Sequence, residues 1–127
     1  MDKFKNPFGY NAAFSALSGI VIMLDAPWIA ANLIGAPVWL FTALGLVLVG
    51  FAGLIAFAAI KDIPHGLGMF ITLQDGLWVL GTTATMGAFW SLVTPMGAAV
   101  IMGVNLIVAS FGMAQYRMLK ARAGVEA

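Results

Sequence analysis

The sequence predicts an all-α protein, an integral membrane four-helix bundle. The chain has 127 residues, of which 62% are hydrophobic and 9% are charged. Soluble domains are about 45–50% apolar and about 25% charged. A soluble domain this small has too little interior to bury so much apolar surface. A bilayer removes the difficulty, because it is itself an apolar solvent.

A spanning helix needs about 20 apolar residues, and four segments of the chain meet this length. Gly35 and Pro37 separate the first two segments, Pro64 interrupts the chain before the third, and Pro95 opens the fourth. Proline is tolerated there, because the first turn of a helix has no partner for its N–H. All 127 residues are expected to form one transmembrane domain. The expected spans are Asn11–Ile34, Pro37–Ile60, Gly66–Trp90 and Pro95–Met118.

The basic residues predict the orientation of these spans. All of them lie near the two termini or in the middle loop, and they are Lys3, Lys5, Lys61, Arg117, Lys120 and Arg122. The positive-inside rule therefore places both termini and the middle loop in the cytoplasm, with the chain multi-pass in the inner or plasma membrane. Trp39 and Trp90 flank the uncharged loops, as an aromatic belt does, although an apolar chain also scatters aromatic residues by chance.

Composition excludes several classes of function. The net charge of +1 gives no footprint for nucleic acid. The absence of cysteine excludes disulfides and thiolate metal sites, and His65 is the only histidine. We therefore expect no metal, no cofactor and no enzymatic activity. His65 is expected to be a solvated loop residue, with a pH sensor as the alternative.

The chain contains an apparent duplication. Asp25-Ala-Pro-Trp28 is similar to Asp75-Gly-Leu-Trp78, and each precedes a second apolar segment. Two parallel two-helix repeats are predicted, at about 11–60 and 64–118, related by an axis along the membrane normal. Chance similarity is the alternative, because only Asp and Trp match outright.

This repeated unit resembles the SPW-repeat family of bacterial membrane proteins, in which a Ser-Pro-Trp core recurs in two-helix units. Here Ala26 stands before Pro27-Trp28, and the second unit has Leu77 before Trp78, so the serine and one proline are missing. The resemblance implies the architecture and no activity.

Polar residues form one stripe on the first expected helix and one on the third. Residues that are three, four or seven positions apart share a helix face. Such stripes should face the protein interior and each other, because lipid leaves polar groups unsatisfied. The first stripe is Asn11, Ser18, Asp25 and Asn32 with Ser15 and Trp28 beside it, and the second is Gly68, Asp75, Trp78, Thr82 and Thr85.

Asp25 and Asp75 are the acids expected at membrane depth, where no Lys or Arg is available as a partner. They should be neutral, share a proton or bind a cation. The alternative is that they only join helices by hydrogen bonds. Such bonds are worth about 0.6–2 kcal/mol, against an insertion cost of about 2.5–3.5 kcal/mol per acid. This difference favours a functional role.

Three further features complete the predicted site. Pro27 removes the helical partner of the Met23 carbonyl, which gives either a cation or proton site with Asp25 and Asn32 or a simple kink. Asn105 should bond across to one of the stripes. Glycines in the second and fourth spans predict close helix packing. The candidate ion, proton or substrate residues are Asp25, Asp75, Asn32, Ser18, Trp28, Trp78, Thr82 and Asn105.

The sequence therefore predicts a proton- or cation-linked transporter or channel, assembled as a homodimer. The alternative is a non-catalytic accessory or assembly subunit of a larger membrane complex. An enzyme that acts on lipid is disfavoured, because no nucleophile or phosphate-binding loop is present.

Overall fold

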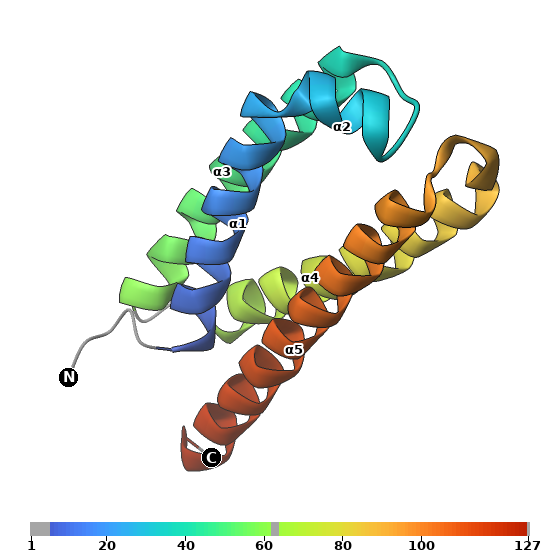
Figure 1. Cartoon of the computed structure of the whole chain (residues 1–127). Helices are drawn as coiled ribbons and strands as arrows, with labels where there is room; N and C mark the ends of the chain where they lie inside the picture. Colours follow the sequence, from blue (N-terminus) through green and yellow to red (C-terminus); the bar gives the residue numbers. More distant parts are fainter. Residues whose placement is uncertain (1–5, 62–63, 127) are drawn as a thin grey trace.

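A computed structural model describes residues 6–61 and 64–126, and this part of the chain is helical almost throughout. It contains five α-helices and one short 3-10 helix (Figure 1). Their bounds are α1 Pro7–Leu24, α2 Ala26–Asn32, α3 Val38–Ile60, α4 His65–Ala88, η1 Trp90–Leu92 and α5 Pro95–Glu126. The all-α prediction is confirmed.

Three helical segments are long and apolar enough to cross a membrane, namely Pro7–Leu24, Val38–Ile60 and Pro95–Arg122. The expected third span corresponds to α4, which is long enough at 24 residues. Gln74, Asp75 and several threonines make it more polar than the others, so it is not among these three. The structure therefore fits a membrane protein through three of its helices.

The first expected span is two helices, because the chain bends at Asp25. Pro27 lies in the first turn of α2 and has no N–H to continue the hydrogen bonding of α1. The backbone N–H of Asp25 still bonds to Val21 at 2.9 Å, and its carbonyl accepts from Ile29 at 2.9 Å. The helix also begins earlier than expected, since the Asn6 side chain caps it by accepting from Gly9 N–H at 3.0 Å.

Two glycines let α1 and α3 lie side by side. A Cβ added to Gly19 would lie 2.7 Å from the carbonyl oxygen of Gly45, and one added to Gly45 would lie 2.5 Å from that of Gly19. Any larger side chain would separate the helices. In contrast, Gly50, Gly53 and Gly103 face open space. Only some of the glycines predicted to allow close helix packing therefore do so within this chain.

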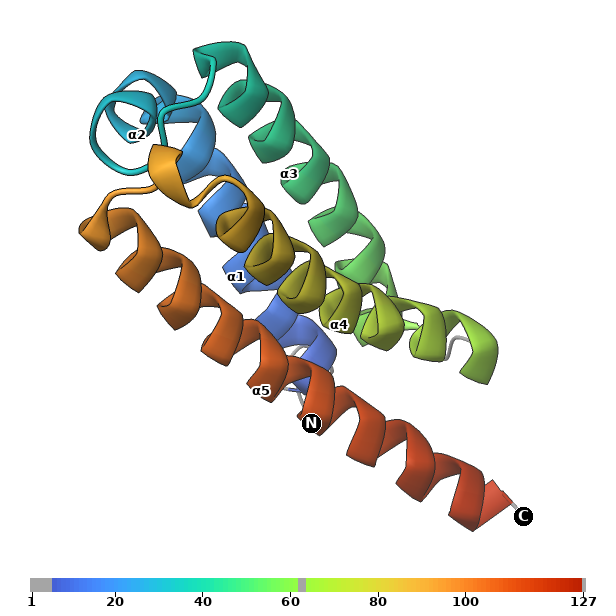
Figure 2. The same cartoon turned by 90° about the vertical axis from the view of Figure 1, so that its right-hand side faces the viewer.

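Helices α1, α2 and α3 form one group, and α4 and α5 form another (Figures 1 and 2). The two groups lie apart along the middle of their length and are in contact at both ends. At one end a hydrophobic core combines residues of α1, α3, α4 and α5, including Phe8, Ile55, Ile71 and Leu119. At the other end the two connecting loops pair. Gly35 N–H donates to the Leu92 carbonyl at 2.8 Å, and Thr94 N–H donates to the Leu33 carbonyl at 2.9 Å.

Candidate functional site

Asp75 is a buried carboxylic acid at the meeting point of three helices. Its side chain is 7% exposed. Its Oδ2 accepts a hydrogen bond from Asn11 Nδ2 of α1 at 2.9 Å and another from Gln115 Nε2 of α5 at 2.8 Å. The carboxyl group of α4 therefore links α1 to α5 through two neutral amides.

The two amides are themselves fixed by a wider network. Asn11 Nδ2 also donates to Gln115 Oε1 at 2.8 Å, and Ser15 Oγ donates to Asn11 Oδ1 at 3.1 Å. Gln115 Nε2 also donates to Thr72 Oγ1 at 3.4 Å. Asn11 and Gln115 are 1% and 0% exposed, so each is held with its polar atoms paired inside the protein. This rigidity fixes the position of the Asp75 carboxyl.

The other carboxyl oxygen of Asp75, Oδ1, accepts no hydrogen bond from the residues that the structure describes. Among those residues only Trp78 Nε1 is both sealed from solvent and unpaired. Oδ1 is therefore not fully sealed from solvent. Asp75 also lines a groove of about 400 Å³ between α4 and α5. No basic side chain of the described part pairs with the carboxyl.

Asp75 lies near the middle of α4, about 15 Å from the start of this 24-residue helix at about 1.5 Å per residue. Its partner Asn11 is in the second turn of α1, and its partner Gln115 directly precedes Tyr116 and Arg117 on α5. The carboxyl is thus buried between helices close to the end where the basic residues of α5 begin.

The two predicted stripes meet where Asn11 donates to Asp75, but Asp25 does not join them. Asp25 is exposed and makes no side-chain cap on α2. It and Asn11 lie at opposite ends of α1, about 21 Å apart at about 1.5 Å per residue. The heptad spacing loses its meaning at this point, because the helix breaks there and α2 takes a new direction.

The other predicted residues near Asp25 do not form a site with it. Asn32 is exposed, and its Nδ2 donates to the Trp28 carbonyl at 2.9 Å, so it does not complete a cation site at Met23. Trp28 is 52% exposed. Ser18 is half-buried on α1. Of the two interpretations of Pro27, the structure favours the kink.

The predicted bond from Asn105 to a polar stripe is present. Thr82 Oγ1 of α4 donates to Asn105 Oδ1 at 3.1 Å, and Asn105 Nδ2 donates to Thr83 Oγ1 at 3.1 Å. Asn105 is 5% exposed. This second polar cluster lies farther along α4 from Asp75, on the same side of the helix.

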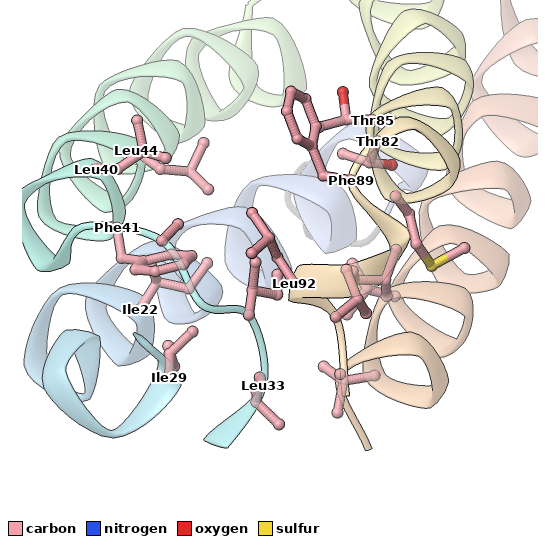
Figure 3. A pocket seen from close by; sticks show the side chains of 18 of the residues that line it. Ile22, Ile29, Leu33, Leu40, Phe41, Leu44, Thr82, Thr85, Phe89 and Leu92 are labelled. Carbon is pink, nitrogen blue, oxygen red and sulfur yellow. The ribbon is translucent and has the colours of Figure 1, made fainter. Parts of the chain in front are cut away.

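A cavity of about 500 Å³ separates the first three helices from the α4–α5 pair. Figure 3 shows Leu40, Phe41 and Leu44 of α3 on one side and Thr82, Thr85 and Phe89 on the other. Trp78 and Asn105 also line this cavity. Its lining is almost entirely hydrocarbon, so it favours apolar contents and offers little to an ion.

Gln115 is not among the residues predicted from the sequence, and Asn11 is predicted only as part of a polar stripe, not as a site residue. A signal for Gln115 is present in the sequence. Asn105, Val108, Gly112, Gln115 and Leu119 follow the alternating three- and four-residue spacing of a helix face that packs on a neighbour. This spacing places Asn105 and Gln115, the two amides of the fourth span, on its buried face.

In the described part, no group of three or more His, Cys, Asp and Glu side chains could hold a metal ion. The chain matches no protein-family model, no curated protein and no solved structure.

Proposed function

We propose that this is a small multi-pass membrane protein in which Asp75 binds and releases a proton, or takes a cation in its place, during transport across the bilayer. In this proposal α4 is the fourth span, and both termini and the loop near Lys61 lie in the cytoplasm. The protein acts as a homodimer in this proposal.

One observation supports the proposal above the others. The Asp75 carboxyl is fixed by two neutral amide donors, has no basic partner in the described part, and has one oxygen, Oδ1, that accepts no hydrogen bond there. If Asp75 only joined helices, it would not need a carboxyl group, because the amide oxygen of an asparagine would accept the same two hydrogen bonds. Acids inside membrane proteins commonly mark proton or ion pathways. Trp78, Thr82 and Asn105 extend the polar face from Asp75 toward the cavity.

A flux assay in proteoliposomes tests this function. Wild type, Asp75→Asn and Asp25→Asn are compared under an imposed pH gradient. Asp75→Asn should reduce proton flux by about tenfold or more, because an amide side chain does not bind and release a proton in the physiological pH range. Asp25→Asn is the matched control, since it removes an exposed acid outside the network, and it should retain the flux. Equal flux from all three proteins would contradict the proposal.

An accessory subunit of a membrane complex is the second candidate, and the length of α5 favours it. The helix has 32 residues, about 48 Å at about 1.5 Å per residue, whereas a bilayer core is about 30 Å thick. Its end projects past the other helices and carries Arg117 and Lys120 (Figure 2). Purification in mild detergent separates the candidates, because a subunit should bring unrelated chains with it.

A further inference from the structure

We infer that the groove beside Asp75 binds a lipophilic organic cation, such as an amphipathic amine, with its charge on Asp75 Oδ1 and its hydrocarbon along α4 and α5. This inference rests on the proposed function and adds the class of substrate. The proton and the organic cation would occupy the same carboxyl oxygen in turn, so that binding of one releases the other.

The groove has the shape for such a ligand. It has a volume of about 400 Å³, within the range of about 300–1,000 Å³ that is usual for small-molecule sites. Val79 and Leu80 of α4 and Val108 and Met113 of α5 line its sides. Gly112 brings the α5 backbone close to the acid, since a Cβ placed there would lie 3.6 Å from Asp75 Cβ.

The charge of the site selects a cation. Oδ2 accepts hydrogen bonds from the amides of Asn11 and Gln115, which leaves Oδ1 free to bind the ligand. No basic side chain of the described part neutralises the carboxyl. Once its proton has left, a carboxylate in apolar surroundings is stabilised by a compensating charge, and a positively charged ligand supplies it.

The same surroundings disfavour a bare metal ion. Hard cations such as Ca²⁺ need about six to eight oxygen ligands to replace their water. Besides Asp75, the polar side chains that line the groove are Thr72 and Tyr116, and the rest of its lining is apolar or glycine. An organic cation needs fewer ligands, because its charge is spread and its body prefers hydrocarbon. The ring of Tyr116 can add a cation–π contact.

The position of the groove also fits a lipophilic molecule. Asp75 lies about 15 Å from the start of the 24-residue helix α4, at about 1.5 Å per residue. In the proposed four-span arrangement this depth is inside the hydrocarbon layer. A cation with a large apolar surface enters that layer more readily than a hydrated ion does.

Equilibrium binding of tetraphenylphosphonium to the full-length protein in lipid nanodiscs tests the inference. Saturable binding is expected for wild type, with release of a proton that a pH indicator detects. Asp75→Asn should weaken binding by about tenfold or more, through loss of the charge. Ala109→Phe should weaken it as well by filling the groove, while its exposed position leaves the Asp75 network intact. Asp25→Asn should bind as wild type does.

The outcomes separate this inference from the proposed function. Absence of tetraphenylphosphonium binding above that of empty nanodiscs, or equal binding by wild type and Asp75→Asn, overturns the inference. If proton flux still depends on Asp75 in that case, the proposed function stands without it. If instead the cation binds through Asp75 with release of a proton while no proton is transported in proteoliposomes, the inference stands and the proposed function fails. Circular dichroism of each variant confirms that it is folded.

Discussion

At the scale of single residues, the two oxygens of the Asp75 carboxyl have different surroundings. Oδ2 accepts hydrogen bonds from two buried amides, which orient the group and hold α1, α4 and α5 together. Oδ1 accepts no hydrogen bond from the described residues and is not fully sealed from solvent. One residue thus combines a structural bond with the proposed position of the exchangeable proton, and substitutions can separate these two roles.

Replacement of Asp75 by Leu or by Asn should affect stability differently. Asp75→Leu leaves the amides of Asn11 and Gln115 without their acceptor, and each unpaired buried donor costs about 1–3 kcal/mol. Asp75→Asn retains an acceptor oxygen and should lower the free energy of unfolding by less than about 1 kcal/mol. Unfolding in mixed micelles measures both values. Equal losses for the two variants would show that the hydrogen bonds do not stabilise the fold.

At the scale of helices, the contact between α1 and α3 depends on Gly19 and Gly45. Gly45→Val should destabilise the protein by about 1–3 kcal/mol, because its side chain would overlap the backbone of Gly19. Gly50→Val is the matched control on the same helix, since an added Cβ there meets nothing within 4 Å. It should change stability by about 0.5 kcal/mol or less. Thermal unfolding in detergent compares the two, and a larger loss for Gly50→Val would contradict the observed packing.

Helix limits that depend on local breakers could be predicted from the sequence. Pro37 and Pro95 mark helix starts close to those observed, because proline disfavours a helical residue before it. The bend at Asp25 is harder to predict, since Pro27 is equally compatible with a kinked continuous helix. Because α4 is unbroken, its polar residues keep the spacing that puts them on one face, and Asp75 is buried. On the first span the helix ends at the bend, so the residues beyond it no longer share that face, and Asp25 is exposed.

Contacts between distant segments could not be predicted in this way. Gln115 is one polar residue in a long amphipathic run, and only the packing of α5 against α1 and α4 shows that it meets Asp75. Similarly, the pairing of Gly35 with Leu92 depends on where both loops end in space. Sequence spacing describes one helix face and contains no information on which other face it meets.

At the scale of the whole molecule, the proposed four spans predict which loops are accessible from each side. The chain has no cysteine, so single cysteines can be introduced without other changes. Ser91→Cys should react with a membrane-impermeant maleimide in intact cells. Lys61→Cys should react only after the membrane is opened, because its loop is proposed to be cytoplasmic. Labelling of both positions from the same side would show that α4 does not cross the bilayer.

The central claim is that Asp75, and not Asp25, carries the exchangeable proton. Infrared spectroscopy of the purified protein in lipid, recorded across a range of pH, tests it most directly. The other acids of the chain give carboxyl C=O bands as well, so each variant is compared with wild type by difference spectroscopy. The pH-dependent C=O band of a buried carboxyl should be lost in Asp75→Asn and retained in Asp25→Asn. Retention of this band in Asp75→Asn, or its loss in Asp25→Asn, would contradict the account.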